Sequence, residues 1–483
     1  MQLLIKANQM DEIKNYNQAL NFYNNLQLDE AIKICNTILQ KNSSHFHTWN
    51  LLGNIFFKLN QLEQAKQFFI TAIEFNPEFI EAYFMLGNTL FSTNSYEDSI
   101  LIWSKALEIN NSELILYTNI ATSYIKLNNF EDAKKYLFLA LNLDNSDKFE
   151  DIFICFSEIY KLQSDFINYK KNLLKALKIN PKNPKTNFDI SYLYFLEKDY
   201  KQAYYHFEFR KNLEEEKQKY NYLPFKNYNF QKLNNKSLLI YHEQGFGDNI
   251  QFARFLNIIN CEKISYGIQK SLYRLFAYNF PKINFTKEIK SSDNFDFMLP
   301  IMSIPYLFNF YDIPNLPYLE VKEEDIFNFK NKILNKNKLN IGIVWSGSKT
   351  SNLSKIKDLK LNDFEPLFKD DRIFYSLQIE NNDEVKNYSN IKILGEDFGD
   401  FYDTATAICA LDIIISTDTA VAHLTGALGK KGFILSNKNQ LDWRWENDNS
   451  KSIWYSNLNI IKYSDIKDGI NILNKELNEL QIF

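Results

Sequence analysis

Hydrophobic and small residues recur with a period of 34 positions across the first 215 residues. In the copy that starts at Phe46, small residues occupy the eighth and twentieth slots, which hold Gly53 and Ala65. Small side chains at these slots let two antiparallel helices approach closely, while large residues at the slots between them fill the space between neighbours. Pro77 ends the second helix of this copy, because proline cannot continue a helix. The pattern predicts a stack of helix pairs.

This period and its slots resemble the tetratricopeptide repeat, over about six units between residues 12 and 215. Such units stack into a superhelix with a concave groove, which implies binding of a protein partner. A plain helical bundle is the alternative fold. Asn15, Asn88 and Asn119 lie on predicted first helices, where they either bind the backbone of a partner or are ordinary polar surface residues.

After a polar and aromatic linker over residues 216–236, the pattern changes to short apolar runs separated by helical stretches. The runs that we expect to contain strands begin at Ser237, or lie within residues 340–347, 372–378, 410–420 and 431–436. Strands that alternate with helices predict parallel sheets and an α/β fold. We expect two such lobes, over 237–337 and 338–483, with a helix and connector at 323–340 between them. Two facing lobes form a cleft suited to a nucleotide-sized ligand.

Composition mainly excludes classes of function. The 55 basic residues against 59 acidic ones give no overall positive charge for nucleic acid or anionic membranes. No run approaches the roughly 20 apolar residues that span a bilayer, and the first residues lack the apolar core of a signal peptide. The cysteines lie far apart without a CxxC pair, at positions 35, 155, 261 and 409. Reduced thiols and a cytoplasmic location are therefore expected, rather than disulfides or a zinc site.

The turn after the first predicted strand holds Gly245, Gly247 and Asp248. The two glycines permit a sharp turn and close approach of a ligand. Asp248 stands at or near the start of the following helix, and two interpretations are open. It is either a helix N-cap, worth about 1 kcal/mol, or a carboxylate at the cleft that acts as a general base.

A second polar turn follows the apolar run that ends at Ser416. A helix that starts near Thr419 and Ala420 presents free N–H groups and a positive dipole end, which suit a phosphate. His423 lies one turn further on the same face, either as a ligand of that phosphate or as a structural histidine. Asp418 either caps the helix or orients His423.

A third turn carries Lys349, Lys355 and Lys357 after the strand expected at 340–347. A run of charge is usually a solvated face. Because this run leaves a strand end in the same lobe as the phosphate-type helix, a cation that faces a diphosphate is the second interpretation.

The segments that carry these features occur in a fixed order: HEQGFGDNIQFARFL, IGIVWSGS, FYSLQ, DTAVAHLTGALG and DWRW. Together they resemble bacterial tetratricopeptide-repeat proteins whose C-terminal half is a GT-B glycosyltransferase, similar to glycosyltransferase family 9, the heptosyltransferases, and to repeat-bearing protein O-glycosyltransferases. The resemblance spans nearly the whole chain. It implies two Rossmann-like lobes, with acceptor contacts in the first and nucleotide-sugar contacts in the second. It also implies inverting transfer without a metal or other cofactor.

The resemblance implies roles for individual residues. Asp248 matches the general base, and the turn of Thr419 and His423 matches the holder of the donor diphosphate. The other donor-side positions are Lys355, Lys357, Gln378, Asp418 and Ala420, and a loop near the cleft without an implied role contains Asp442, Trp443 and Arg444. Ala420 departs from the glycine common in heptosyltransferases, which leaves less room for phosphate and argues against heptose. The basic segment is rich in Lys where relatives often have Arg or His, and Lys lacks a bidentate grip on phosphate.

The sequence therefore predicts an inverting, metal-independent glycosyltransferase that moves a sugar from a nucleotide-sugar to a hydroxyl group of a protein held by the repeats. The alternative function is a repeat scaffold whose α/β half is a vestigial, inactive nucleotide-binding domain. A lipid or glycan acceptor is the third possibility.

Overall fold

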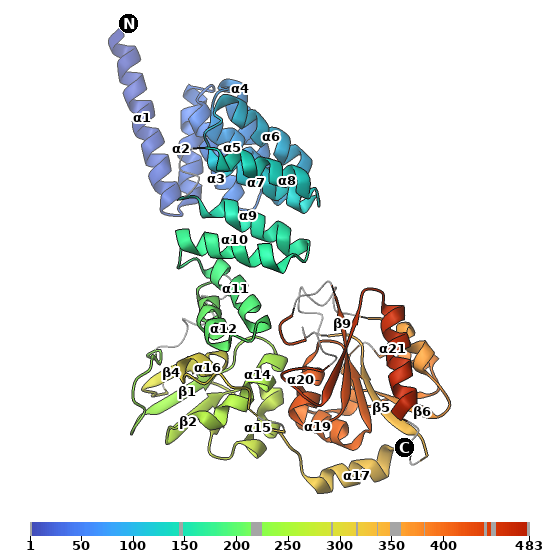
Figure 1. Cartoon of the computed structure of the whole chain (residues 1–483). Helices are drawn as coiled ribbons and strands as arrows, with labels where there is room; N and C mark the ends of the chain where they lie inside the picture. Colours follow the sequence, from blue (N-terminus) through green and yellow to red (C-terminus); the bar gives the residue numbers. More distant parts are fainter. Residues whose placement is uncertain are drawn as a thin grey trace. The chain divides into compact units, whose positions relative to one another are not determined.

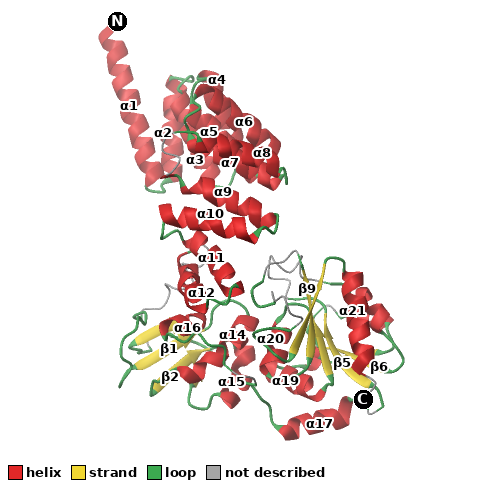
Figure 2. Ribbon diagram, viewed as in Figure 1, coloured by secondary structure: helices red, strands yellow, loops and turns green. Residues whose placement is uncertain are grey.

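The computed structural model describes residues 2–143, 148–213, 225–290, 293–314, 317–335, 337–347, 359–380, 382–438, 442–445 and 451–480, with side chains from Asp11 onward. They form two compact units, Met1–Thr186 and Asn187–Phe483. The first unit is helical and the second combines helices with two sheets (Figure 1; Figure 2).

The first unit consists of successive helices joined by short turns. They are α1 (Gln2–Asn24), α2 (Leu28–Lys41), α3 (Phe46–Lys58), α4 (Leu62–Phe75), α5 (Ile80–Ser92), α6 (Tyr96–Ile109), α7 (Leu114–Lys126), α8 (Phe130–Leu141), α9 (Glu150–Leu162) and α10 (Phe166–Ile179). The small residues allow the helices of a pair to approach closely, as predicted. A side-chain carbon at Gly53 would lie only 2.4 Å from the ring of Phe69. At Gly87 the same carbon would lie 2.1 Å from the indole of Trp103.

The turns inside the helix pairs share one backbone feature. A residue with positive φ follows the first helix of each pair, and these residues are Leu26, Asn60, Asn94, Asn128, Ser164 and Lys198. Asparagine tolerates this left-handed conformation better than most residues, which explains its use at three of the six turns. The backbone therefore repeats with the same period as the sequence.

The second unit begins within α11 (Pro184–Leu196) and continues through α12 (Tyr200–Phe207) and the 3₁₀ helix η2 (Glu208–Asn212). We expected these residues in the repeat array, up to residue 215. Their large side chains instead pack on the α/β part: Phe195 stacks on Trp443, and Tyr204 contacts Phe252 edge to face. The two compact units divide after Thr186, while α11 and α12 keep the turn of the repeat at Lys198.

The first sheet contains four parallel strands in the order β3-β2-β1-β4. The strands are β1 (Ser237–Tyr241), β2 (Lys263–Gly267), β3 (Asn284–Thr286) and β4 (Phe297–Pro300). With α14 (Phe246–Phe252), η3 (Ala253–Ile258), η4 (Lys270–Leu272), α15 (Tyr273–Asn279), η5 (Ile301–Ser303) and α16 (Ile304–Leu307) they form what we call the first lobe. The expected linker takes part in this lobe, since the N–H of Tyr228 donates to the carbonyl of Met298 at 2.8 Å.

The second sheet contains six parallel strands in the order β10-β9-β8-β5-β6-β7. The strands are β5 (Leu339–Val344), β6 (Arg372–Ser376), β7 (Ile391–Ile393), β8 (Ile413–Ser416), β9 (Gly432–Asn437) and β10 (Leu458–Tyr463). Their helices are η6 (Leu361–Leu367), η7 (Asp383–Asn387), η8 (Gly395–Asp397), α19 (Phe401–Ala410), α20 (Ala420–Ala427) and α21 (Ile466–Glu479), and we call this part the second lobe. The helix α17 (Glu323–Ile333) precedes it, as predicted for the connector.

The strand orders determine where ligands can bind. In each sheet the strands are added first on one side of the first strand and then on the other. In the first lobe this strand is β1, between β2 and β4, and in the second lobe it is β5, between β6 and β8. The second sheet has the order of a doubly wound dinucleotide-binding domain. In open parallel sheets the crevice beyond the carboxyl ends of the strands, at the point where this change of side occurs, receives ligands. The predicted parallel α/β organisation is confirmed, and the polar turns lie at these strand ends.

Candidate functional site

The turn after β1 places Asp248 in the first turn of α14. The carboxylate oxygen Oδ2 of Asp248 accepts a hydrogen bond from the N–H of Gly245 at 3.2 Å, and Gly245 is the N-cap residue of the helix. Asp248 is thus the third helical residue in a capping arrangement, rather than the N-cap itself. The positive φ in this turn belongs to Gln244, whereas Gly245 has an ordinary φ of −80°. The turn does not use the conformational freedom expected of Gly245.

Gly247 lies where the two lobes come into close contact. A side-chain carbon at Gly247 would lie 2.6 Å from Cδ2 of His423 and 3.6 Å from Cα of Ala420. The close approach predicted for this glycine is therefore made by another part of the same chain. It brings the start of α14 in the first lobe against the start of α20 in the second.

The helix α20 begins as the sequence predicted, with Thr419 as the N-cap residue. The hydroxyl of Thr419 lies 2.9 Å from the hydroxyl of Ser416, and it makes no capping bond to the helix within the described part of the chain. The positive end of the helix dipole is consequently not neutralised by its own N-cap side chain. Asp418 and Ala420 flank Thr419 in the same turn.

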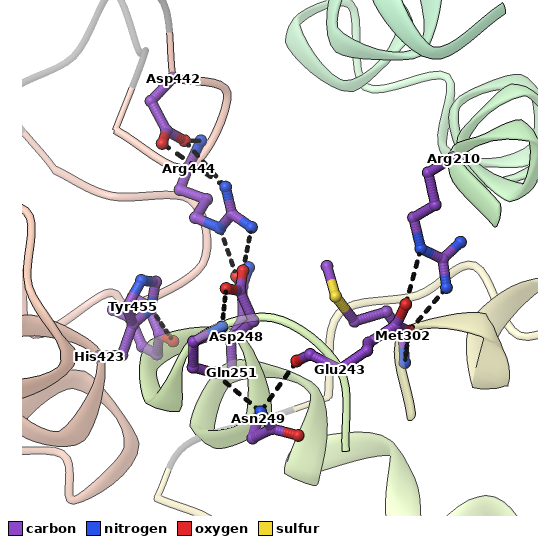
Figure 3. A network of polar contacts seen from close by, with 11 residues as sticks. Arg210, Glu243, Asp248, Asn249, Gln251, Met302, His423, Asp442, Arg444 and Tyr455 are labelled. Carbon is purple, nitrogen blue, oxygen red and sulfur yellow. Dashed lines mark hydrogen bonds and ion pairs between the residues drawn. The ribbon is translucent and has the colours of Figure 1, made fainter. Parts of the chain in front are cut away.

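His423 is buried, with 5 % of its surface exposed. Its Nδ1 lies 2.9 Å from the hydroxyl of Tyr455, and its ring lies against the indole of Trp445 at a centroid distance of 5.0 Å. The opposite edge of the ring faces Gly247. His423 therefore packs between the lobes and fixes α20 against the loop that contains Tyr455 (Figure 3).

An arginine from the second lobe binds Asp248 (Figure 3). Nη2 of Arg444, in the loop between β9 and β10, donates to Oδ1 of Asp248 at 2.5 Å. Nε of the same guanidinium donates to Oε1 of Gln251 at 2.7 Å, and its Nη1 lies 3.3 Å from Oδ1 of Asp442. The amide nitrogen of Gln251 has no hydrogen-bond partner among the residues that the structure describes.

The environment of Asp248 changes its acidity. Burial raises the pKa of Asp248 above its ordinary value, and the nearby carboxylates of Asp442 and Asp418 raise it further. Arg444 and the hydrogen bond from Gly245 oppose this rise in the pKa. A carboxylate with a raised pKa is a better proton acceptor than an exposed aspartate, which suits a general base.

Gln378 connects the carboxyl ends of two strands in the second sheet. Its Oε1 accepts hydrogen bonds from the backbone N–H groups of Trp345 at 2.9 Å and Ser346 at 2.7 Å. Its Nε2 donates to the carbonyl of Glu380. Gln378 thus orders the end of β5, where the crevice of this sheet begins. Lys349, Lys355 and Lys357 follow that strand end and lie outside the described residues.

A second ionic cluster lies near the turn after β1, and no sequence pattern predicts it (Figure 3). Nη2 and Nε of Arg210 donate to the two carboxylate oxygens of Glu243 at 2.7 and 3.1 Å, and the N–H of Met302 donates to Glu243 at 2.9 Å. The pair joins η2 to the end of β1. Gln251 was missed as well, although its position three residues after Asp248 on one helix places both side chains on the same face.

The asparagines predicted on the first helices of the repeats lie in the other unit. Nδ2 of Asn119 lies 3.5 Å from Oδ1 of Asn88, so these side chains come from neighbouring repeats to one place. Asn15 is half-buried on α1.

The sequence predicts neither a metal site nor a membrane span. The described ranges contain no group of three or more His, Cys, Asp or Glu side chains arranged to hold a metal ion. None of the helices described there is long and apolar enough to cross a bilayer.

Part of the helical unit matches models of a known repeat. A tetratricopeptide repeat model matches residues 47–79, and a second model of the same description matches residues 80–113 and 115–147. No curated protein matches the sequence.

Several solved structures are similar to part of the chain. TTC0263, a thermophilic TPR protein of Thermus thermophilus, is 18 % identical over 36 % of this chain and 94 % of its own, with a TM-score of 0.31. YrrB, a TPR protein with an unusual peptide-binding site, is 16 % identical over 38 % and 92 %, with a TM-score of 0.29. Pseudomonas aeruginosa pilF is 12 % identical over 44 % and 98 %, with a TM-score of 0.38. The matches to the repeat models show that the chain carries tetratricopeptide repeats in its N-terminal part, as its 34-residue period predicted.

Proposed function

We propose that the chain is an inverting, metal-independent glycosyltransferase of the GT-B type, which moves a sugar from a nucleotide-sugar to a hydroxyl group of a protein held by the repeats. One observation carries the proposal. Asp248 lies in the first turn of α14 in the first lobe, next to Gly247, which packs against Ala420 and His423 at the start of α20 in the second lobe. The helix turn that carries the carboxylate thus lies against the positive end of α20, at the boundary between two parallel sheets.

Asp248 is the proposed general base. An acceptor hydroxyl has a pKa far above 7, so its proton must leave as its oxygen attacks the anomeric carbon. The bond from that oxygen to the carbon forms, the bond from the carbon to the nucleotide phosphate breaks, and the proton passes to Asp248. The raised pKa of Asp248 favours this transfer.

The start of α20 is the proposed site of the leaving nucleotide. Backbone N–H groups at a helix start stabilise the negative charge that grows on the phosphate, and the N-cap side chain of Thr419 leaves them uncapped. Asp418 and Asp442 add negative charge nearby, so a diphosphate there needs further cations. Lys355 and Lys357 are the proposed source of that charge. Because Ala420 stands where heptosyltransferases commonly have glycine, we propose a sugar other than heptose.

The repeats supply the acceptor in this proposal. Tetratricopeptide repeats commonly bind segments of partner proteins, and a bound partner has a high local concentration at a domain on the same chain. The partner is then modified by the α/β part.

The test is a screen of UDP-, GDP-, ADP- and CMP-sugars for nucleotide release, with and without proteins captured on the full chain. We expect release with one nucleotide class and its loss in Asp248→Asn. The matched control is Asp383→Asn, which removes an exposed carboxylate of the second lobe and keeps the activity. If the wild-type protein binds and cleaves none of these donors, the proposed transferase is wrong.

The second candidate function is a repeat scaffold with an inactive α/β part. Two observations favour it: His423 is buried between the lobes, and Arg444 occupies one oxygen of Asp248. Calorimetry with the four nucleotides discriminates the two functions, because a scaffold with a vestigial site binds none of them and still captures the partner.

A further inference from the structure

Arg444 reaches from the second lobe to two residues of α14 that lie one helical turn apart. Its Nη2 bonds to Oδ1 of Asp248 at 2.5 Å, and its Nε bonds to Oε1 of Gln251 at 2.7 Å. The planar guanidinium therefore docks on one face of the helix with two donors of fixed geometry. Lysine, a point charge, offers no such pair.

The position of Arg444 is fixed from its own side as well. Its backbone N–H donates to Oδ1 of Asp442 at 3.0 Å, and its guanidinium carbon lies 4.3 Å from the centre of the Trp443 ring. The side chains of Arg444 and Asp248 are 10 % and 19 % exposed, while Gln251 is fully buried. An ion pair with this little water around it is weakly screened, so the attraction between its charges is stronger than in an exposed pair.

The contacts leave Asp248 able to accept a proton. A carboxylate has about four acceptor positions, and the described residues occupy two of them: one on Oδ1 by Arg444 and one on Oδ2 by Gly245. Arg444 thus orients the carboxylate without occupying all of its acceptor positions.

We propose that Arg444 is a positioning residue, which holds the carboxylate of Asp248 across the lobe boundary and keeps it ionised until the acceptor hydroxyl arrives. This inference rests on the proposed function for its catalytic meaning. The contact itself does not depend on that function. The loop between β9 and β10, for which the sequence indicated no role, thereby acquires one.

Several charged and titratable groups surround Asp248, and they determine whether the loss of Arg444 raises or lowers the pKa of its carboxyl group. Arg444 favours the ionised form, whereas Asp442 of the same loop and Asp418 of the turn before α20 oppose it. Tyr192 of α11 also lies within electrostatic reach of Asp248 and Arg444. Without Arg444, burial and the two carboxylates still disfavour the ionised form of Asp248, and no nearby cation among the described residues favours it. The carboxyl group of Asp248 then titrates at a higher pH.

A purely structural role for Arg444 is the competing explanation, since the residue links the two lobes. The chain offers a matched control in Arg274, which links the first lobe to Asp400 at 2.9 Å and to Asp403 of the second lobe. Arg274→Gln removes an ionic link between the lobes without touching Asp248.

The first experiment needs no enzyme activity. The full-length protein is labelled with ¹³C at the aspartate carboxyl groups, and the signal of Asp248 is identified by its loss in Asp248→Asn. We expect its titration midpoint to rise by about one pH unit or more in Arg444→Gln, less in Arg444→Lys, and not at all in Arg274→Gln. An unmoved midpoint in Arg444→Gln, or an equal rise in Arg274→Gln, overturns the proposal. If Arg444→Gln does not fold, Arg444→Lys decides on the same criterion.

The second experiment uses the donor and acceptor that the screen identifies. We expect the acid limb of the pH profile of kcat to move upward in Arg444→Gln by the same amount as the titration midpoint, with the KM for the donor little changed. An unchanged acid limb overturns the positioning role. If no donor is turned over by the wild-type protein, the proposed function fails, while the titration still decides whether Arg444 controls Asp248.

Discussion

The ring of Phe195, in the last helix pair, stacks on the indole of Trp443 with centroids 4.2 Å apart and planes 15° apart. Trp443 immediately precedes Arg444, which binds Asp248. The same indole meets Trp454 edge to face at 4.9 Å. A helix with the repeat pattern therefore supports the loop that completes the candidate site.

This relationship predicts where the α/β part can be separated. A fragment of residues 187–483 should unfold cooperatively, whereas a fragment of residues 237–483 should be poorly folded or aggregate. The shorter fragment exposes the partners of Phe195, Tyr204 and Phe207, and each buried ring contributes about 1.5–3 kcal/mol. Circular dichroism during urea titration measures the difference. Equal cooperativity of the two fragments would contradict the structural role of α11 and α12.

The contact at Gly247 predicts that Gly247→Ala is destabilising. The new methyl group meets His423 at 2.6 Å, and overpacking of this kind costs about 1–3 kcal/mol. Gly245→Ala is the matched control, because the nearest atom to its new carbon is 3.6 Å away and its φ is ordinary. Thermal denaturation of the two variants should therefore separate them. If Gly245→Ala lowers the thermal stability as much as Gly247→Ala does, the start of α14 is intolerant of a side chain in general, and the contact between the lobes is not the cause.

Asp248→Asn should separate catalysis from binding. The amide keeps the shape of the side chain but cannot take up a proton from the acceptor, so we expect turnover to fall by about 10²–10⁴-fold. Donor affinity should stay within about threefold, a change of less than 1 kcal/mol. Calorimetry and the initial rate of nucleotide release measure the two quantities. Turnover at the wild-type rate would remove Asp248 from the mechanism.

The buried pair of Arg210 and Glu243 predicts a large effect on stability. Arg210→Met keeps the volume of the side chain and leaves the Glu243 carboxylate unpaired, which costs about 3–5 kcal/mol when a buried pair is broken. Lys236→Met is the control, because its pair with Asp296 is exposed and is worth about 0–1 kcal/mol. Urea denaturation of residues 187–483 measures the free energy of unfolding of the two variants. Similar decreases in both would contradict the larger contribution of the buried pair.

His206 predicts a dependence of stability on pH. Burial lowers the pKa of His206 from its ordinary 6.5 to about 4. Its Nδ1 lies 2.7 Å from Oδ1 of Asn187, and its ring stacks on Tyr194. The unfolded chain takes up the proton first, so the contribution of this histidine is complete above pH 6.5 and is lost progressively as the pH falls towards 4.

His206→Gln should reduce that loss, because glutamine does not titrate. The free energy of unfolding of residues 187–483 is measured from about pH 7.5 to about pH 4 for both proteins. The wild-type advantage over the variant should shrink as the pH falls. An advantage that stays constant across this range would mean that His206 is protonated equally in both states.

Much of the fold follows from local patterns in the sequence. The 34-residue period predicted the helix pairs, since close approach of two helices needs a small residue at a fixed slot such as Gly53. All five predicted strand regions contain strands, and each is an apolar run that ends in a polar turn. The strands β2, β3, β4, β7 and β10 were not predicted, because several are only three to five residues long and contain polar residues.

The boundary between the two units did not follow from the pattern. Phe195 and Tyr204 each lie one position after a repeat slot, those of Tyr194 and Ala203, and the 34-residue pattern does not say whether another repeat or a sheet with its helices covers them. The sequence period specifies which face of a helix is apolar. It does not specify what covers that face.

Local sequence was enough to establish that helix pairs precede parallel sheets, and that Asp248 and Thr419 stand at strand-to-helix turns. The pairing of Arg444 with Asp248, 196 residues away, and the burial of His423 against Gly247 arise only in the folded chain. The difference lies in the range of the interactions. Helix starts and strand ends depend on a few neighbouring residues, whereas this ion pair and this close packing contact depend on how the two sheets and their helices pack together.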